Sequence, residues 1–242
     1  MTATDQNALK RAAASRALDY VSDGMKLGLG SGSTAEAFVD LLAPRVRGGL
    51  KVLCVPTSDQ TATRARALGI TLASLDELAP LDLTVDGADE ADRELTLIKG
   101  GGGALLREKI VAAASKRMVV IADDSKLVAR LGKYPLPVEV LEFGHKATAA
   151  HLLEVIAAQG YGNAPVTQRV RDGAPFRSDS GNLIYDCALG AITSAPKLAA
   201  AIAAIPGVVE HGLFIGLART LLVAHPGEVE VIERGRSAAI GA

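Results

Sequence analysis

Four short polar segments of this chain each follow directly after a short apolar run. They are Gly28-Leu29-Gly30-Ser31-Gly32-Ser33-Thr34, Asp86-Gly87-Ala88-Asp89, Lys99-Gly100-Gly101-Gly102-Gly103 and Ala122-Asp123-Asp124-Ser125-Lys126. Their carboxylates, ammonium groups and hydroxyls are groups that move protons and bind phosphate. In an open parallel α/β sheet, ligands bind beyond the carboxyl ends of the strands. If each apolar run is such a strand, the four segments meet at one composite site, as expected of an enzyme.

The first segment offers a site for an anion. Its glycines and hydroxyls stand where a helix is expected to begin, and the unpaired N–H groups and positive dipole end of a helix suit a phosphate dianion. Ser33-Thr34-Ala35-Glu36 has the pattern of a capping box. The spacing Gly28-x-Gly30-x-x-Ser33 lacks the third glycine of a dinucleotide fingerprint, and no lysine follows as in a Walker loop. A purely structural strand-to-helix turn explains this loop equally well.

Two further segments carry ionisable groups. Asp86 and Asp89 can point two carboxylates into a crevice and divide acid and base roles, although an isolated Asp-x-x-Asp is more often a turn and helix cap. A metal is disfavoured because Lys99 can neutralise the acids and no histidine accompanies them. Lys99 precedes four glycines. Each glycine costs roughly 1 kcal/mol in ordering relative to alanine, which favours a ligand in contact with their amides.

Glu108 and Lys126 are weaker signals when taken alone. Glu108 stands between Arg107 and Lys109, a pattern more typical of a solvated helix face. Lys126 can donate to a phosphate, but an exposed loop lysine is the commoner case. The four histidines lack metal-ligand spacing, and no Gly-x-Ser-x-Gly motif is present. We therefore interpret the histidines as structural or surface residues; they are His145, His151, His211 and His225.

Alternating helices and strands must position these segments. The apolar spacing predicts helices over 8–21 and 104–114, and helices that begin near 33 and near 57, the latter closed by Gly69. Strands are predicted at 25–29, 52–55, 70–72, 81–85, 95–98 and 118–122. The continuous apolar run of the last strand suits burial on both faces. This alternation predicts an α/β fold built on a parallel sheet.

The pattern changes after about Gly132. A break at 134–137 precedes a strand at 138–143, a helix at 148–159, two strands around the Asp172-Gly173 and Ser180-Gly181 turns, and a helix from Pro196. Such an order is consistent with a small α+β domain inserted in a larger one. Strands at 213–215, 220–224 and 229–232 then predict a return to the first domain. The expected division is therefore 1–132 plus 207–242 for the larger domain and 133–206 for the smaller.

Composition narrows the class of partner. The 26 Lys and Arg residues nearly balance the 27 Asp and Glu residues, which favours a small molecule and disfavours nucleic acid or an anionic membrane. Cys54 and Cys187 are too few and too distant for a disulfide framework, and buried thiols in a reducing compartment are expected. No apolar stretch approaches the roughly 20 residues of a membrane span, and the first residues lack a secretory signal. We therefore expect a cytoplasmic protein.

In their order along the chain, these motifs closely resemble those of ribose-5-phosphate isomerases of the A type. The motifs are Gly-x-Gly-Ser-Gly-Ser-Thr at 28–34, Val-Asp-Gly-Ala-Asp-Glu at 85–90, Lys-Gly-Gly-Gly-Gly-Ala at 99–104, Glu108-Lys109, Ser125-Lys126, Ser180-Gly181-Asn182 and His211-Gly212-Leu213-Phe214. The resemblance implies a Rossmann-like domain with a smaller, ferredoxin-like α+β domain, assembled as a homodimer or homotetramer. It also implies interconversion of D-ribose 5-phosphate and D-ribulose 5-phosphate in the pentose phosphate pathway, without a metal or organic cofactor.

The same resemblance implies roles for individual residues. Glu108 matches the proton acceptor, and Lys10 is expected to reach the phosphate. The implied substrate-binding positions are Ser31, Gly32, Ser33, Thr34, Asp86, Gly87, Ala88, Asp89, Lys99, Gly100, Gly101, Gly102 and Lys126. Ser31 replaces the threonine that the family more often has, but it keeps a hydroxyl.

The implied reaction moves a proton between adjacent sugar carbons through a cis-enediolate. We assign this transfer to Glu108, enediolate contacts to Lys99 and the glycine amides, ring opening to Asp86, and orientation of sugar hydroxyls or of Lys99 to Asp89. A sugar-phosphate sensor is disfavoured because the short N-terminal region leaves no room for a helix-turn-helix. The incomplete glycine fingerprint disfavours a nicotinamide-dependent dehydrogenase. A related deaminase or coenzyme A transferase is disfavoured by the complete Asp86 and Lys99 motifs.

Overall fold

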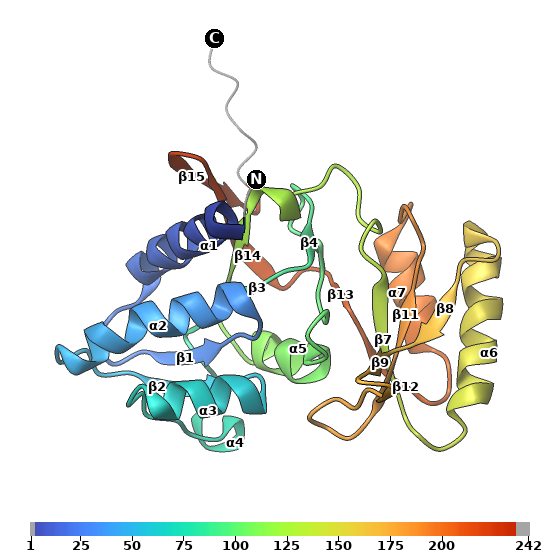
Figure 1. Cartoon of the computed structure of the whole chain (residues 1–242), viewed down its shortest axis with the longest axis horizontal. Helices are drawn as coiled ribbons and strands as arrows, with labels where there is room; N and C mark the ends of the chain where they lie inside the picture. The colour runs from blue at the N-terminus through green and yellow to red at the C-terminus, as the bar shows by residue number, and fades with distance from the viewer. Residues whose placement is uncertain (1–2, 236–242) are drawn as a thin grey trace, which may run out of the picture.

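A six-stranded sheet forms the centre of the computed structural model, which describes residues 3–235 (Figure 1). Its strand order is β15-β14-β6-β3-β1-β2. Within this sheet β2, β1, β3, β6 and β14 run parallel to one another, and β15 pairs antiparallel with β14 at the edge. The bounds are β1 (Lys26–Leu29), β2 (Leu53–Pro56), β3 (Leu83–Gly87), β6 (Met118–Asp123), β14 (Ala218–His225) and β15 (Glu228–Glu233). This sheet confirms the predicted α/β fold.

Helices pack against this sheet and bury its apolar residues. Phe38 of α2 shares one hydrophobic cluster with Val119 of β6, whereas the next residue of β6, Val120, belongs to a second cluster with Ala112 of α5. Successive side chains of a strand point to opposite faces, so β6 is buried on both, as predicted. The helices of this part are α1 (Ala3–Ala17), η1 (Leu18–Tyr20), α2 (Ser33–Arg47), α3 (Asp59–Ala67), α4 (Leu75–Leu78), α5 (Leu105–Ala113) and η2 (Asp124–Lys126).

The lysine-glycine segment follows a strand of a separate antiparallel sheet. That sheet has the order β13-β5-β4, with β4 (Glu90–Ala91), β5 (Leu97–Ile98) and β13 (Leu213–Phe214). The prediction that all four polar segments leave one parallel sheet is therefore wrong for Lys99. Between β4 and β5 the chain reverses in a turn in which the Leu95 and Thr96 amides donate to Asp92. Apolar alternation alone does not reveal such a reversal.

A four-stranded antiparallel sheet with two helices forms the smaller part of the molecule. Its strand order is β12-β7-β11-β8, and its apolar core is separate from those of the large sheet. The elements are β7 (Leu136–Val140), α6 (His145–Ile156), the π-helical turn η3 (Ala157–Tyr161), β8 (Val166–Gln168), β9 (Val170–Arg171), β10 (Ala174–Pro175), β11 (Leu183–Cys187), α7 (Ala195–Ala203) and β12 (Val208–His211). The division 1–132 plus 207–242 and 133–206 stays a prediction, although β12 pairs within this smaller sheet. Residues 1, 2 and 236–242 lie outside the described residues.

Some local predictions need correction. The capping box at Ser33 does not form: Gly32, at φ 85°, is the N-cap of α2, and the Ser33 hydroxyl accepts a hydrogen bond from Lys10 instead. Helix α1 begins before residue 8, and residues 70–72 contribute only a single bridge to β2. Gly69 does follow α3 in the left-handed conformation, at φ 78°, as predicted.

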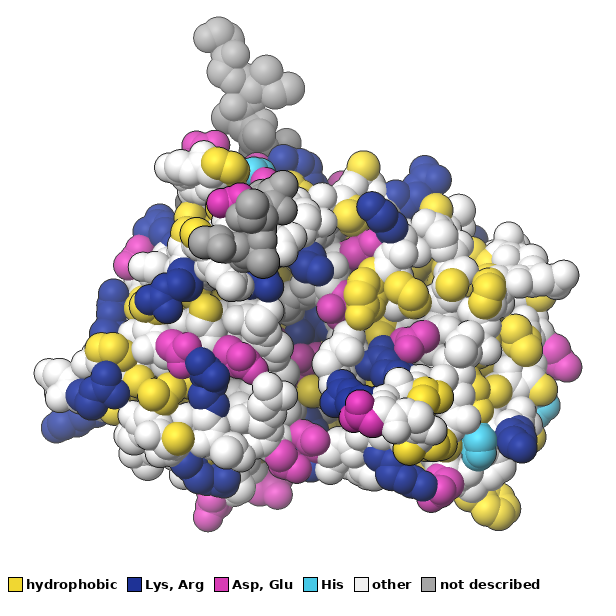
Figure 2. Space-filling model, in the orientation of Figure 1, with side chains coloured by type: hydrophobic (Ala, Val, Ile, Leu, Met, Phe, Trp, Pro, Cys, Tyr) yellow, Lys and Arg dark blue, Asp and Glu magenta, His cyan; other side chains and the backbone are white. Residues whose placement is uncertain are grey.

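The mixture of surface charges and the burial of the two thiols agree with what the composition predicts. Figure 2 shows basic and acidic side chains interspersed over the visible face. No helix within residues 3–235 is long and apolar enough to cross a membrane. Cys54 and Cys187 are buried free thiols, and burial raises the pKa of both.

Two phenylalanines of opposite burial test this description of the core. Phe38 is fully buried, so Phe38→Ala should lower the free energy of unfolding by about 3–5 kcal/mol through lost burial and a residual cavity. Phe143 is 95% exposed, and Phe143→Ala should change stability by less than about 0.5 kcal/mol. Urea unfolding of both variants measures the difference. Equal losses would contradict the packing of α2 on the sheet.

Candidate active site

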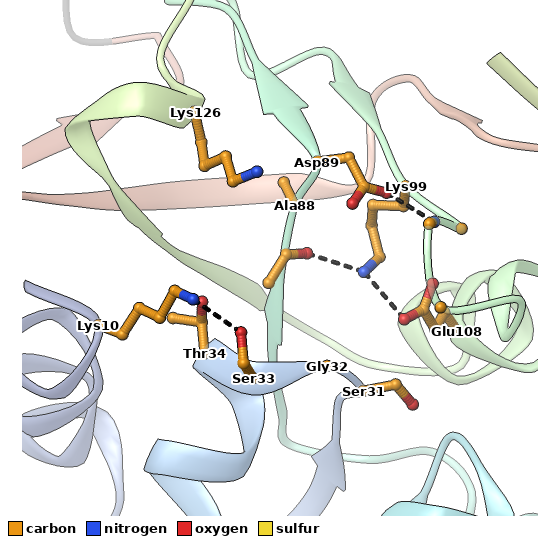
Figure 3. Close-up of a pocket in the computed structure, with 14 residues that line it drawn as sticks. Lys10, Ser31, Gly32, Ser33, Thr34, Ala88, Asp89, Lys99, Glu108 and Lys126 are labelled. Carbon is orange, nitrogen blue, oxygen red and sulfur yellow. Dashed lines mark hydrogen bonds and ion pairs between the residues drawn. The ribbon is translucent and has the colours of Figure 1, made fainter. Parts of the chain in front are cut away.

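A pocket of about 570 Å³, partly open to solvent, lies at the carboxyl ends of β1 and β3 (Figure 3). Its walls contain every predicted substrate-binding residue except Asp86, together with Glu108 and Lys10. The lining residues are Lys10, Ser31, Gly32, Ser33, Thr34, Gly87, Ala88, Asp89, Lys99, Gly100, Gly101, Gly102, Glu108 and Lys126. Segments that lie far apart in the sequence therefore meet at one site.

One buried ammonium joins two buried carboxylates at this site. Lys99 Nζ lies 3.0 Å from Asp86 Oδ2 and 3.2 Å from Glu108 Oε1, and it donates to the Gly87 carbonyl at 2.8 Å. The exposed fractions of Asp86, Lys99 and Glu108 are 0%, 2% and 4%. Burying any one of these ions alone would be costly, so each depends on the others.

Burial and the unequal number of positive and negative charges shift the pKa values of these three groups. Burial raises the pKa of Glu108 to about 8; the Lys99 charge opposes the rise, and the charges of Asp86 and Asp89 add to it. Burial also raises the pKa of Asp86. For Lys99, burial acts to lower the pKa, but the two carboxylates outweigh it and raise that pKa. Lys99 therefore remains an ammonium at neutral pH, while Glu108 can exchange a proton near neutrality.

Helix α5 directs Glu108 into the pocket. Its Oε2 is buried and has no hydrogen-bond partner among residues 3–235. The flanking cations have other partners, because Arg107 pairs with Asp59 and Lys109 donates to Glu210. The interpretation of Glu108 as part of a solvated helix face is therefore wrong, since α5 is held by protein contacts on several sides. Glu108 therefore lines the pocket with one carboxylate oxygen paired to Lys99 and the other unpaired within the described residues.

Asp86 lies behind the pocket wall. Its Oδ1 accepts hydrogen bonds from the Ser31 and Gly87 amides at 3.1 Å and 2.7 Å. A Cβ atom at Gly30 would stand 2.1 Å from this carboxylate, so only glycine allows the end of β1 to come so close. Direct contact of Asp86 with a substrate, expected from the sequence, does not fit this geometry. The side chain instead holds the first loop and the Lys99 ammonium.

The glycine run folds into a tight turn beside Asp89. Gly100 and Gly103 have φ values of 104° and 89°, which side-chain-bearing residues rarely adopt. The Gly101 amide donates to Asp89 Oδ2 at 2.8 Å. Within the described part of the chain, the amide of Gly102 has no acceptor, and Gly102 lines the pocket. This amide is a donor available to an anionic oxygen.

Cations and hydroxyls line the opposite end of the pocket. Lys10 Nζ donates to Ser33 Oγ at 2.9 Å, and Lys126 extends toward the same end of the pocket from η2 (Figure 3). Thr34 lies in the first turn of α2, where the amides have no helical acceptor. Ser31 also lines the pocket, and its hydroxyl is hydrogen-bonded to that of Thr57 at 2.7 Å.

The sequence did not predict the contacts that Lys99 makes outside the pocket. The Lys99 amide donates to the Gly212 carbonyl at 2.9 Å, and Lys99 Nζ lies 5.5 Å from the centre of the Phe214 ring. Lys109 Nζ lies 5.0 Å from the same ring. The segment His211-Gly212-Leu213-Phe214 is one of the motifs shared with the family, but its composition does not indicate that it contacts Lys99. It supports Lys99 from the side away from the pocket.

The assembled groups suit acid–base chemistry on an anionic substrate. A carboxylate with a raised pKa can accept a proton, the neighbouring ammonium and amide can stabilise negative charge, and the cationic end can hold a phosphate. Among residues 3–235, no three His, Cys, Asp or Glu side chains gather to hold a metal ion. His211 is buried, and burial lowers its pKa to about 4, in keeping with a structural role.

Known proteins match this chain over most of its length. Residues 53–228 match the family model of ribose 5-phosphate isomerase A (phosphoriboisomerase A). The ribose-5-phosphate isomerase A of Nitrobacter hamburgensis is 58% identical over 94% of this chain and 98% of its own length. That of Brucella suis is 55% identical over 93% and 97%.

Solved structures agree with these sequence matches. Ribose 5-phosphate isomerase from Plasmodium falciparum is 37% identical, with a TM-score of 0.90 over 95% of this chain and 100% of that one. Ribose 5-phosphate isomerase A from Methanocaldococcus jannaschii is 38% identical, with a TM-score of 0.85 over 94% and 99%. The chain therefore belongs to the ribose 5-phosphate isomerase A family and is an isomerase.

Proposed function

We propose that this protein interconverts D-ribose 5-phosphate and D-ribulose 5-phosphate through an enediolate, in the non-oxidative branch of the pentose phosphate pathway. Family membership supports the isomerisation. The mechanism is supported above all by Glu108, which has an unpaired carboxylate oxygen and a raised pKa beside the Lys99 ammonium. A base must be close to its substrate and have a pKa near the working pH, and Glu108 meets both conditions.

Glu108 carries one proton between two carbons. In the forward direction it takes the proton from C2 of the open-chain aldose, and the electrons of that C–H bond move to form the enediolate, with negative charge on O1. Glu108 then returns the proton to C1, while the hydroxyl proton on O2 passes to O1. The product is the ketose, and Glu108 is again a carboxylate. One carboxylate therefore serves both steps without a net change in the protein.

Fixed donors stabilise the transient anion. Lys99 and Gly102 line the pocket together with Glu108, and the Gly102 amide has no acceptor among residues 3–235. Because they are held before the substrate arrives, they need no reorganisation when charge develops on oxygen. Removal of one such donor typically costs about 3–4 kcal/mol of transition-state stabilisation.

The two aspartates have different roles in this proposal. Asp86 is fully buried and keeps Lys99 charged and in place. Asp89 lines the pocket, so we assign to Asp89, rather than to Asp86, contact with the sugar hydroxyls and help in ring opening. The phosphate binds at the cationic end of the pocket, which is lined by Lys10, Ser33, Thr34 and Lys126. This placement brings the sugar carbons toward Glu108.

Five broader properties complete the proposal. The reaction uses no metal and no organic cofactor, since a carboxylate, an ammonium and amides supply all the required groups. The protein acts on a small sugar phosphate and has neither nucleic acid nor a membrane as a partner. It works in the cytoplasm as a homodimer or homotetramer. The larger sheet with the pocket forms a catalytic domain, and the smaller sheet a second domain.

The first test combines a variant with a chelator. Glu108→Gln removes the base but keeps the shape, and should lower kcat for ribose 5-phosphate by at least about 100-fold, as expected for lost general-base catalysis. The wild type should keep full activity with EDTA present. Glu154→Gln, on the exposed side of α6, is the matched control and should be unaffected. Retained turnover in Glu108→Gln would remove the base assignment, and EDTA-sensitive turnover would remove the metal-free one.

The raised pKa of Glu108 predicts a pH dependence. Only the ionised carboxylate accepts a proton, so kcat/KM should rise with pH and level off above a pKa of about 8. Below that value the rate should fall about tenfold per pH unit as Glu108 becomes protonated. Initial rates at low substrate concentration, in buffers of constant ionic strength, measure this profile. A plateau reaching down to about pH 5 would indicate an ordinary glutamate and contradict the proposal.

The cationic end predicts an effect on binding. Lys126→Ala removes a charge from the phosphate site and should raise KM for ribose 5-phosphate by about 10-fold or more, with kcat less changed, because the phosphate is held equally before and during reaction. Lys133→Ala is the control, since Lys133 is exposed and does not line the pocket. Steady-state kinetics of both variants decide the matter, and equal KM values would argue against a phosphate at this end.

A further inference from the structure

Arg169 reaches from the smaller sheet to the glycine turn of the active site. It stands between β8 and β9, and its backbone is held on both sides: its amide donates to the Ile184 carbonyl at 2.8 Å, and its carbonyl accepts from the Phe176 amide at 2.9 Å. Its side chain is 12% exposed. The guanidinium therefore lies partly buried on a fixed segment, although neither the motif pattern nor the pocket lining identifies it.

The guanidinium bonds to two elements at once. Its Nε and Nη2 donate to the two carboxylate oxygens of Asp186 on β11, at 2.9 Å and 2.5 Å. Its Nη1 donates to the Gly100 carbonyl at 2.8 Å and to the Gly101 carbonyl at 3.1 Å. The pairing with Asp186 fixes the plane of the guanidinium, and the remaining donor then fixes two consecutive carbonyls of the glycine turn.

These carbonyl bonds set the direction of the amides. A peptide unit is planar and trans, so the N–H of the next residue points away from the carbonyl. The Gly100 carbonyl faces Arg169, and the Gly101 N–H accordingly faces Asp89. The Gly101 carbonyl also faces Arg169, which leaves the Gly102 N–H directed away from it, with no acceptor among residues 3–235.

We propose that Arg169 is a positioning residue that holds the Gly102 amide in the direction required to stabilise the enediolate. The proposal rests on the proposed function, since it assigns that amide to the reacting oxygen. Glycine backbones lack a steric preference of their own, so this turn needs external contacts to keep one conformation. Asp89 supplies a hydrogen bond from the larger part of the molecule, and Arg169 supplies two from the smaller part.

A lysine cannot replace Arg169 in this role. An ammonium lacks the planar fork that binds a carboxylate with two donors while a third donor reaches elsewhere. Arg169→Lys keeps the charge and much of the bulk, but it loses the fixed plane. The role therefore depends on guanidinium geometry rather than on positive charge alone, which separates it from a general electrostatic effect.

The test uses three variants and a rescue. Arg169→Ala and Arg169→Lys should each lower kcat by about 10- to 100-fold, the range typical of lost supporting contacts, with KM changed less than about threefold. Arg171→Ala is the matched control: Arg171 lies on the same hairpin, is exposed, and contacts the Phe176 ring but not the glycine turn. Added guanidinium ion should raise kcat of Arg169→Ala and leave Arg171→Ala unchanged. Thermal unfolding of each variant confirms that it is folded at the assay temperature.

The outcomes separate this proposal from the proposed function. Wild-type turnover of ribose 5-phosphate decides the function, and the ratio of variant to wild-type kcat decides the role of Arg169. Unchanged kcat in folded Arg169→Lys, or equal losses in Arg169→Ala and Arg171→Ala, would overturn the positioning role. A loss confined to KM would also overturn it, because a misdirected amide should impair the reacting state rather than initial binding.

Discussion

The site depends on one buried interaction, in which a single ammonium pairs with two carboxylates. Lys99 balances part of the charge of Asp86 and Glu108, and none of the three is more than 4% exposed. Burial raises the pKa of Glu108, and the charge of Asp86 adds to the rise, because one negative charge stays uncompensated when both acids are ionised. The Lys99 charge limits this rise, and in the proposed mechanism the same ammonium stabilises an anionic oxygen. One cluster therefore sets the base strength of Glu108 and supplies a donor to the anion.

The fold maintains this cluster by bringing together segments that contribute little alone. Strand β3 carries Asp86, the antiparallel strand β5 leads into Lys99, and helix α5 presents Glu108. Close approach requires small residues where these elements meet, because a Cβ at Gly30 would collide with Asp86 and one at Gly212 with the backbone of Lys99. The glycines of this chain therefore serve packing as much as they serve flexibility.

The sequence predicted the parallel sheet and most of the pocket, because apolar periodicity and polar strand ends are local features. Glu108 was identified only through its resemblance to a family motif, since its immediate neighbours suggested a solvated face. The antiparallel origin of Lys99, the burial of Asp86 and the failed cap at Ser33 depend on contacts between distant segments. Arg169 was not predicted at all, because its partners in the glycine turn are carbonyl oxygens, and every residue has one.

A direct titration of the Glu108 carboxyl tests the central claim most sharply. Carbon-13 NMR of protein labelled at glutamate side-chain carboxyls, compared with the same spectra of Glu108→Gln, identifies the resonance that belongs to Glu108. The buried position of Glu108 predicts a carboxyl that titrates near pH 8 in the wild type and is missing from the variant. A Glu108 resonance that titrates near the ordinary value of 4.5 would contradict it.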